Sequence, residues 1–390
     1  MSIGRPRLCV VTPVHWKTFM GGAQYQIKCM LDHLRVLDRY DISYVARRVP
    51  DVTEIDGYQL HRIGRGGRMP RFGYASDAPS LSCILRDLQP DVIYQRVGCA
   101  YTGIAAYYAQ RSGARLVWHA SSDADLDRKV RLAETNFIRN RLESSALSYG
   151  IRHANRIVVQ TSQQARLLGE YYSRTPDAII ANFHPLPEER RAPDIPLRIV
   201  WIANFKRLKQ PEVFLRLAHS LRALEQVRFV MIGAPASGDG EAEWNDALKL
   251  QIASLPNLTH LGQLNQAEVN EQLIGAYAFV NTSVYEGFPN TFIQAWLREV
   301  PVISLAVNPD GILDQASVGI HAKTEQGLIE AVRLIVEDRA MHDRLARNAG
   351  EHAREHHSMK NAQRLVQLFD SALASRNQSL PDSATSDVQT

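Results

Sequence analysis

The run Leu197-Arg-Ile-Val-Trp-Ile202 predicts a short buried strand, and a second run of the same kind, Val227-Arg-Phe-Val-Met-Ile232, follows one helix later. Further strands are expected at 258–261, 279–281 and 302–305, and helices at 210–225, 241–254, 266–276, 290–298 and 324–376. Strands that alternate with helices predict a parallel sheet covered on both faces. This half of the chain is therefore expected to be a doubly wound α/β domain.

The first half of the chain shows the same alternation. Short apolar strands are expected at 8–11, 91–94, 115–118 and 156–159, with helices at 24–37, 77–88, 99–112, 134–153 and 162–171. Residues 183–197 interrupt this pattern with four prolines and no periodicity, as expected of a linker. Two Rossmann-like doubly wound domains are therefore expected, with the ligand site in the cleft between them, beyond the carboxyl ends of the strands.

Charge is distributed unevenly over a chain whose 390 residues carry a net charge of +4. Residues 1–195 hold 27 Lys and Arg against 19 Asp and Glu, whereas residues 196–390 hold 18 against 22. The basic half is expected to meet an anionic partner, for which a nucleic acid, a phospholipid surface and a phosphorylated substrate stay open. No apolar run approaches the roughly 18 residues that a membrane-spanning helix needs.

The four cysteines lie within the first hundred residues, without zinc-ligand or Cys-x-x-Cys spacing: Cys9, Cys29, Cys83 and Cys99. Each has apolar neighbours. We therefore expect reduced core residues of a cytosolic protein.

Two loops that follow predicted strands suit an anion. Gly21-Gly22 precedes a helix, where backbone N–H groups and a dipole of about +0.5 charge favour phosphate; a flexible turn is the alternative. Lys206, Arg207 and Lys209 suit a diphosphate, because charge-assisted contacts to phosphate oxygens are strong. A solvated basic turn is the alternative.

The stretch from Asn281 to Trp296 reads Asn-Thr-Ser-Val-Tyr-Glu-Gly-Phe-Pro-Asn-Thr-Phe-Ile-Gln-Ala-Trp. A strand ends, Glu286 stands in the loop, and a helix is expected from about Asn290, because proline and asparagine favour helix starts. Glu286 is expected to point into the cleft, with bare backbone N–H groups just after it. A capped helix with an incidental glutamate is the alternative.

This stretch resembles the E-x7-E region of the retaining nucleotide-sugar glycosyltransferases of family 4, which have the GT-B fold. The resemblance extends to about residue 375 and includes Gly21-Gly-Ala-Gln24, Asp91-Val-Ile-Tyr-Gln-Arg96, Trp118-His119, Trp201-Ile-Ala-Asn204, Pro301-Val-Ile-Ser-Leu305 and Asn308-Pro-Asp-Gly311. It implies an acceptor-binding domain over 1–185, a nucleotide-sugar-binding domain over 186–357, and a helix at 358–376 that returns to the first domain. The polar residues 377–390 are expected to be disordered.

The resemblance also implies a role for each matched residue. Lys209, with Lys206 or Arg207, would neutralise the diphosphate, and Glu286 would bind hydroxyls of the donor sugar. Gln294, which replaces the family's usual Glu, would hold the ribose hydroxyls, and His119 would contact the sugar near its reacting carbon. His119, Glu286 and Lys209 are thus the expected catalytic residues. The remaining expected donor contacts are Gly21, Gly22, Asn204, Gly287, Phe288, Pro289, Asn290 and Thr291.

The chemistry of the family implies transfer without a metal or other cofactor. No carboxylate is an obvious nucleophile, so front-face transfer is expected, with the leaving phosphate as base and with cations and N–H groups stabilising its charge. Asp123 and Asp125 have the spacing of a metal loop, but they follow His119, where the resemblance expects acidic residues. Glu299 stands where the family usually has a glycine, a left-handed position that costs other residues about 1 kcal/mol.

A basic loop of the first domain contains Arg62, Arg65, Arg68 and Arg71. In a GT-B enzyme this loop would face a lipid-linked diphosphate acceptor or an anionic membrane surface, and a merely solvated loop is the alternative. No nucleic-acid partner is expected, because the chain has no binding motif of that kind and no aromatic residues interleaved with the basic ones.

We therefore expect a retaining, metal-independent hexosyltransferase that moves a sugar from a nucleoside diphosphate sugar to a saccharide or lipid-linked acceptor. The expected setting is bacterial surface polysaccharide or glycolipid biosynthesis, in the cytoplasm or at the inner face of the membrane. Two alternatives stay open. One is a nucleotide-sugar epimerase, which needs no acceptor, and the other is a catalytically silent GT-B partner subunit, which Gln294 and Glu299 would fit.

Overall fold

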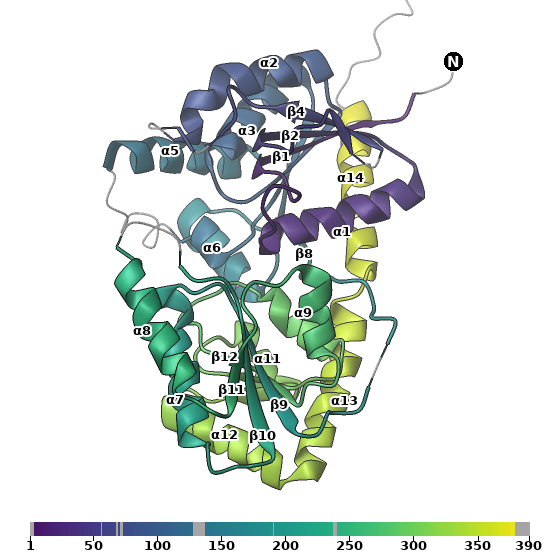
Figure 1. Ribbon diagram of the computed structural model, residues 1–390. Helices are drawn as coiled ribbons and strands as arrows, with labels where there is room; N and C mark the ends of the chain where they lie inside the picture. The colour runs from purple at the N-terminus through teal and green to yellow at the C-terminus, as the bar shows by residue number, and fades with distance from the viewer. Residues whose placement is uncertain are drawn as a thin grey trace, which may run out of the picture. The chain divides into compact units, whose positions relative to one another are not determined.

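The computed structural model describes residues 4–55, 57–67, 69–70, 73–127, 137–189, 191–236 and 240–378. Contacts divide the chain into two compact units: unit 1 comprises Met1–Ala181 with Met359–Thr390, and unit 2 comprises Asn182–Ser358. Each unit is built around its own sheet, with helices packed on both faces (Figure 1).

The sheet of unit 1 has eight strands in the order β3-β4-β2-β1-β5-β6-β7-β8. Neighbouring strands are parallel except at one edge, where β3 pairs antiparallel with β4. The strands are β1 (Arg7–Val14), β2 (Asp41–Arg48), β3 (Glu54–Ile55), β4 (Tyr58–Arg62), β5 (Val92–Arg96), β6 (Arg115–His119), β7 (Arg156–Val159) and β8 (Ala178–Ile179).

Helices of unit 1 connect these strands and bury their apolar faces. They are α1 (Gly22–Leu37), α2 (Ala78–Leu88), α3 (Ala100–Ser112), α5 (Phe137–His153), α6 (Ser162–Tyr172) and α14 (Lys360–Gln378), with short 3-10 turns η1 (Tyr74–Asp77) and η2 (Asp123–Asp125). A buried cluster on one face joins β1, β5 and β6 to α2, α3 and α5; Val11, Trp118 and Leu147 belong to it. Burial of such side chains stabilises the unit by roughly 1.5–3 kcal/mol each.

The sheet of unit 2 has six parallel strands in the order β11-β10-β9-β12-β13-β14. The strands are β9 (Leu197–Ile202), β10 (Val227–Ile232), β11 (Leu258–His260), β12 (Ala278–Asn281), β13 (Val302–Ser304) and β14 (Gly319–His321). Counted from β9, this is the 3-2-1-4-5-6 order of the Rossmann fold.

Helices cover both faces of the second sheet. They are α7 (Pro211–Ser220), α8 (Ala242–Ala253), α9 (Gln266–Leu273), α10 (Asn290–Trp296), α11 (Ile312–Gln315), α12 (Glu325–Glu337) and α13 (Arg339–His356), with 3-10 turns η3 (Arg207–Lys209) and η4 (Pro309–Gly311). Successive side chains of β9 point to opposite faces, so Ile199 and Trp201 join the core under α7 and α12, whereas Val200 joins the core under α9, α10 and α13. The apolar run at 197–202 is therefore buried on both sides.

The predicted α/β class with parallel sheets is confirmed, and the structure adds strands that the sequence analysis did not predict. These are β2, β3, β4, β8 and β14. The prediction that all four cysteines are core residues is wrong for Cys83, which lies on the solvent side of α2, while Cys9, Cys29 and Cys99 are buried and all four are free. Helix α14 runs to Gln378, and residues 379–390 of the expected tail lie outside the described residues.

Candidate functional site

Unit 2 has a topological switch point at its first strand. Because β9 lies between β10 and β12, the connections that leave β9 and β12 pass to different faces of the sheet. Ligands of open α/β sheets bind beyond the carboxyl ends of the strands at such a point. The loop after β9 carries Lys209 and the loop after β12 carries Glu286, so the topology brings two of the predicted site residues to one place.

Lys209 and Glu286 form an ion pair that joins these two loops. Lys209 Nζ lies 2.9 Å from Glu286 Oε1, and the two side chains are 21% and 19% exposed. Such a partly exposed pair stabilises a fold by about 1 kcal/mol or less. Both charges remain accessible. The ammonium group can therefore bind an anionic ligand group, and the carboxylate can bind the hydroxyl groups of a ligand.

The carboxylate of Glu286 is held through one of its two oxygens. Besides Lys209, Ser283 Oγ donates to Oε1 at 2.6 Å and Asn281 Nδ2 donates to it at 3.0 Å. No hydrogen bond from the described residues reaches Oε2. The arrangement fixes the carboxylate while leaving one oxygen for a ligand's hydroxyl groups.

The backbone at Lys209 is braced from the core of the sheet. Buried Trp201 donates its indole N–H to Thr282 Oγ1 at 2.9 Å, and Thr282 Oγ1 donates in turn to the carbonyl oxygen of Lys209 at 2.6 Å. Val284 N donates to the carbonyl oxygen of Leu208 at 2.9 Å. Three hydrogen bonds thus preorganise the loop that presents the ammonium group.

The other basic residues of this loop do not gather around Lys209. Arg207 lies over the ring of Trp244, 4.8 Å from the ring centre, and reaches Glu241 at 3.7 Å on the side of α8. Lys206 is exposed, and its side chain makes no hydrogen bond or ion pair with the described residues. Asn204 is also exposed and accepts a long hydrogen bond from Ala234 N at 3.4 Å. Only Lys209 of the three predicted cations therefore contacts Glu286.

The segment from Gly287 to Thr291 follows Glu286 directly, and α10 begins at Asn290 after Pro289, as predicted. Asn290 Oδ1 accepts a hydrogen bond of 3.1 Å from His184 Nε2, and the carbonyl oxygen of Phe288 accepts one of 3.1 Å from Asn182 Nδ2. Burial lowers the pKa of His184 to about 4, although the Asn290 contact opposes the shift. The neutral ring therefore holds the start of α10 at neutral pH.

Gln294 is buried inside unit 2. Its side chain is 3% exposed, and Nε2 donates to Asn270 Oδ1 on α9 at 2.8 Å. The predicted contact with a ribose would have to replace this hydrogen bond.

The predicted site residues of unit 1 lie at the carboxyl ends of its strands. Gly21 is the N-cap of α1, and a Cβ there would lie 2.8 Å from Gln24 Oε1; Gly22 is the first residue of the helix. His119 ends β6 with no exposed surface, and Tyr94 Oη lies 2.9 Å from its Nδ1. Burial, with the nearby Arg96 charge, lowers its pKa well below the usual value. Contact between this ring and a sugar would require its neighbours to move.

The predicted basic loop is described only in part. Arg62 lies 3.3 Å from Asp51, Arg65 is exposed, and Arg68 and Arg71 lie outside the described residues. Asp123 and Asp125 belong to η2, where Asp125 Oδ2 accepts hydrogen bonds from Ser121 and Ser122. Asp123 Oδ1 accepts one from Gln164. Asp125 therefore stabilises the local turn, and Asp123 connects this turn to α6.

Three residues that precede Glu286 in the same stretch were not predicted as site residues: Asn281, Thr282 and Ser283. Their polar side chains at the end of a buried strand were the available signal, because such groups need partners. Thr282 finds its partners, Trp201 and Lys209, on β9 and in its loop, more than 70 residues away, which the sequence pattern does not reveal. Asn281 and Ser283 instead bind Glu286 within the same stretch.

A family model matches part of the chain. Residues 185–352 match the family model for glycosyl transferases group 1. The matched segment contains Lys209, Glu286 and the elements that position them. A search among curated proteins gave no match.

Solved structures similar to the whole chain include sucrose-phosphate synthase from Thermosynechococcus elongatus (TM-score 0.74, 16% identity, covering 95% of this chain and 100% of that chain). HepE from Anabaena, in complex with UDP and glucose, gives a TM-score of 0.72 at 15% identity, with 94% and 100% coverage. WaaG, a glycosyltransferase of lipopolysaccharide biosynthesis, gives 0.68 at 12% identity, with 89% and 95% coverage. At such identities the likeness concerns the fold, and the predicted GT-B class is confirmed.

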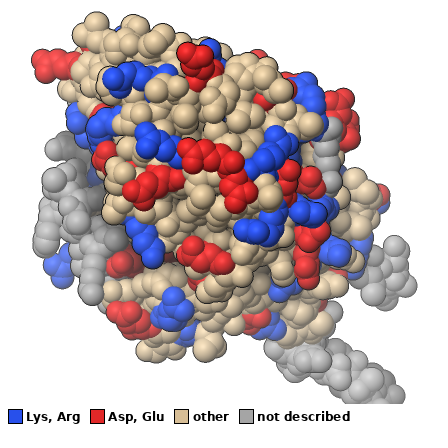
Figure 2. Space-filling view, turned by 90° about the horizontal axis from the view of Figure 1, so that it is seen from below, with Lys and Arg blue, Asp and Glu red and all other residues tan. Residues whose placement is uncertain are grey.

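Two further surface properties bear on partners. Among the described residues on the face drawn in Figure 2, basic and acidic side chains lie interspersed. Exposed ion pairs of unit 2 include Arg216 with Glu325 and Arg339 with Asp343. Within the described part of the chain, no helix combines the length and apolar character needed to span a membrane.

Proposed function

We propose that the chain is a retaining, metal-independent glycosyltransferase of hexosyltransferase type, with a nucleoside diphosphate sugar as donor. The observation that carries this proposal is the Lys209–Glu286 pair at the switch point of unit 2, inside the segment that matches glycosyl transferases group 1. A cation for a diphosphate and a carboxylate for sugar hydroxyls stand 2.9 Å apart there.

The roles follow from the charge that develops during transfer. As the bond between the anomeric carbon and the diphosphate breaks, negative charge grows on the leaving phosphate, and Lys209 stabilises it. Glu286 binds hydroxyls of the sugar through its open oxygen, while Ser283 and Asn281 hold the carboxylate in place. Lys206 and Asn204 are exposed on the same loop and provide further donor contacts. Gly287, Phe288, Pro289, Asn290 and Thr291 complete the proposed donor site.

Retention follows from front-face transfer, in which the leaving phosphate takes the proton of the acceptor hydroxyl. Metal independence is supported by Asp123 and Asp125, whose carboxylates accept hydrogen bonds from the protein itself. Removal of divalent ions by a chelator is therefore expected to leave the rate of transfer unchanged.

Unit 1 is proposed to hold a saccharide or lipid-linked acceptor, with Gly21, Gly22 and His119 near the reacting groups. Two similar proteins support this class of substrate: HepE is solved with UDP and glucose, and WaaG is involved in lipopolysaccharide biosynthesis. The proposed setting is surface polysaccharide or glycolipid biosynthesis in the cytoplasm, at an anionic membrane surface that Arg62 and Arg65 would face.

The test is an assay of sugar transfer and of acceptor-free donor hydrolysis with UDP-, GDP- and ADP-sugars. Glu286→Gln is expected to lower kcat/KM for the donor by at least tenfold, because it removes a charged partner of the sugar hydroxyls. Glu330→Gln, on the exposed side of α12, is the matched control and is expected to retain full activity. NMR of the first product is expected to show the anomeric configuration of the donor.

Two results would contradict the proposal. Equal activity of Glu286→Gln and Glu330→Gln would remove Glu286 from the site. Conversion of the donor to its epimer without an acceptor would replace transfer with epimerisation.

A further inference from the structure

A cavity of about 800 Å³ lies in unit 1, away from every residue placed in the site above. Four arginines from four different elements line it: Arg7 at the start of β1, Arg86 on α2, Arg111 on α3 and Arg376 on α14. Its size falls in the range of pockets that hold small organic ligands, about 300–1,000 Å³.

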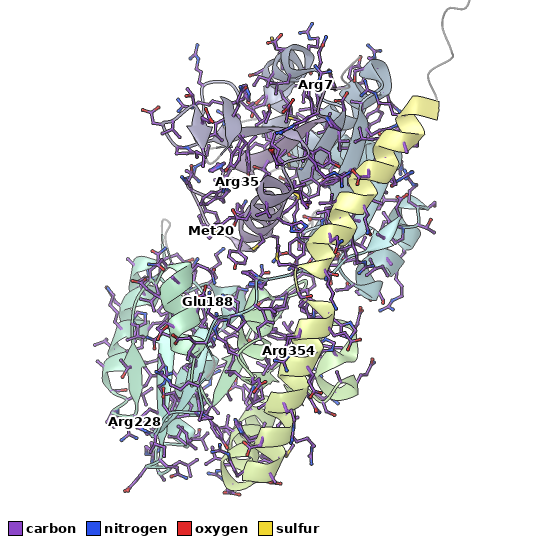
Figure 3. All side chains as sticks on the ribbon, turned by 90° about the vertical axis from the view of Figure 1, so that its right-hand side faces the viewer. Arg7, Met20, Arg35, Glu188, Arg228 and Arg354 are labelled. Atoms are coloured by element: carbon purple, nitrogen blue, oxygen red, sulfur yellow. The ribbon has the colours of Figure 1, made fainter. Side chains whose placement is uncertain are left out.

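The cavity lies at the amino ends of the strands. Arg7 is the first residue of β1, and Pro90 precedes β5, whereas Gly21 and Gly22 follow the carboxyl end of β1. The eight residues of β1 span about 23 Å. Figure 3 labels Arg7 and Met20, which lie on opposite sides of unit 1. The cavity is therefore separate from the edge of this sheet at which the acceptor is proposed to bind.

Acidic side chains compensate this charge only in part. Asp91 is shared by Arg7, whose Nε lies 3.7 Å from Oδ2, and by Arg376, which hydrogen-bonds Oδ1. Burial would raise the pKa of Asp91, but the hydrogen bonds and charges of these two arginines lower it, so the carboxylate is ionised at neutral pH.

The other two arginines have no carboxylate partner among the described residues. Arg86 Nε donates to the carbonyl oxygen of Ser82, and the Arg111 guanidinium lies over the ring of Tyr107, 4.3 Å from its centre. Both residues are exposed. Their remaining N–H groups are available to an anion.

Three of the arginines stand in the last turns of helices, where the helix dipole also favours a cation. Each helix end contributes about half a negative charge. Four guanidinium groups, one carboxylate and three helix ends still leave a net charge of about +1 to +2 at the cavity. Helix capping therefore explains only part of the cluster, and the remaining positive charge matches one phosphate group.

We propose that this cavity binds a phosphate ester, with Arg86 and Arg111 as its principal contacts and Arg7 and Arg376 behind them. Guanidinium groups bind phosphate oxygens in pairs of parallel hydrogen bonds, a geometry for which arginine is better suited than lysine. Tyr107, whose ring lies under Arg111, and Tyr108 line the same cavity and add apolar surface and hydroxyl groups for the organic part of the ligand. The phosphate group can come from a soluble metabolite or from the headgroup of an anionic lipid.

The experiment separates these two sources on the full chain. Glycerol 3-phosphate is titrated calorimetrically as the soluble probe, and phosphatidylcholine vesicles with and without phosphatidic acid are tested by co-sedimentation. Arg86→Ala/Arg111→Ala is expected to lose at least tenfold in affinity for whichever probe binds. The matched control is Arg152→Ala/Arg166→Ala, which removes two exposed charges of unit 1 that do not line the cavity, and it is expected to bind like the native chain.

Lys209→Ala provides the second control, because a phosphate probe can also occupy the proposed donor site. It is expected to keep the binding that the arginine variant loses. Thermal unfolding establishes that each variant is folded. Three results would overturn the proposal. Neither probe binds, the native chain and Arg86→Ala/Arg111→Ala bind equally, or only Lys209→Ala loses binding.

Discussion

At the residue scale, Glu286 is distinguished by what surrounds its carboxylate. Three donors from three side chains converge on Oε1, and each lies within 3.0 Å. A carboxylate held in this way loses little freedom when a ligand binds, so its interaction with a sugar is preorganised. Ser283 and Asn281, which hold the carboxylate without a proposed ligand contact of their own, should therefore also matter for donor use.

Ser283→Ala tests this positioning role. It removes the shortest contact to Glu286, a hydrogen bond to a charged group worth about 1.5–3 kcal/mol. We expect kcat/KM for the donor to fall about tenfold, with the loss reversed by Ser283→Thr. Ser220→Ala removes an exposed serine hydroxyl of α7 and is expected to leave kcat/KM for the donor unchanged. Equal kinetics of the two alanine variants would refute the role of Ser283.

Glu299 has the left-handed backbone that the sequence analysis inferred, with φ of +58°. Its side chain packs on Gly350 of α13, where a Cβ would lie 2.6 Å from Glu299 Cγ, and Arg354 reaches its Oε1 at 3.4 Å. Position 299 therefore lacks the glycine that is usual in the family, and the helix against which Glu299 packs has a glycine at position 350.

Glu299 and Gly350 are therefore expected to be energetically coupled. Gly350→Ala should destabilise the native chain by about 1 kcal/mol through overpacking. In a Glu299→Gly background the same change should stabilise by about 0.5–1 kcal/mol, because alanine is the better helix former. Urea unfolding of the native chain, the two single variants and the double variant measures both effects. An effect of Gly350→Ala with the same sign in both backgrounds would contradict this account.

At the scale of elements, α3 and α5 approach each other through glycines. A Cβ on Gly103 would lie 2.2 Å from the carbonyl oxygen of Ala146, and a Cβ on Gly150 would lie 2.5 Å from the carbonyl carbon of Thr102. The two helices therefore meet backbone to backbone, and no side-chain movement can make room for an added methyl group.

Gly103→Ala is expected to destabilise the chain by about 3 kcal/mol, because α3 and α5 must move apart. Gly169→Ala on α6 is the matched control: no atom lies within 4 Å of its Cβ position, and alanine should stabilise this helix by about 0.5–1 kcal/mol. Thermal or urea unfolding compares the two. A similar effect of both substitutions would show that the close approach is not a constraint.

The elements also show how far sequence patterns reach. Strands such as β9 and β10 are predictable because they are buried on both faces and apolar almost throughout. Strand β2 is harder to predict because charged residues at its two ends, Asp41, Arg47 and Arg48, shorten its apolar run. Strand β14 is harder to predict because its three residues carry little periodicity. Helix α10 ends at Trp296, before the predicted end at 298. Residues 297–299 form a turn instead, and Glu299, the last residue of this turn, has a left-handed backbone conformation.

The same limit applies to the site. Lys209 and Glu286 could be predicted, because each follows a strand whose carboxyl end lies at the switch point. The position of Arg207 over Trp244 and the bond from Gln294 to Asn270 could not, because their partners lie on α8 and α9. Side-chain direction at these positions depends on tertiary contacts that no local pattern encodes.

At the scale of the whole molecule, both units bury neutral histidines. Burial lowers the pKa of His184 to about 4 and that of His357 to about 3 in unit 2, and the pKa of His15 to about 4 in unit 1. The unfolded chain binds protons on these rings below about pH 6.5, while the folded chain does not.

Stability is therefore expected to fall as the pH decreases from about 6.5 toward 4. Each buried histidine contributes a loss of about 2 kcal/mol between roughly pH 7 and pH 5. Urea unfolding over this range measures the loss of stability. His357→Gln removes one of the buried rings and should therefore reduce this loss by the contribution of one histidine. Stability that stays constant or increases on acidification would contradict the burial of these rings in neutral form.

We propose that Lys209 and the loops of unit 2 bind a nucleoside diphosphate. The most direct measurement is calorimetric titration of UDP, GDP and ADP into the native chain without divalent metal. Lys209→Ala is titrated in parallel, with Lys249→Ala as an exposed, charge-matched control on α8. We expect one nucleotide to bind the native chain and Lys249→Ala equally, and Lys209→Ala to lose at least tenfold in affinity. Absence of binding by all three nucleotides, or equal affinity of all three proteins, would contradict it.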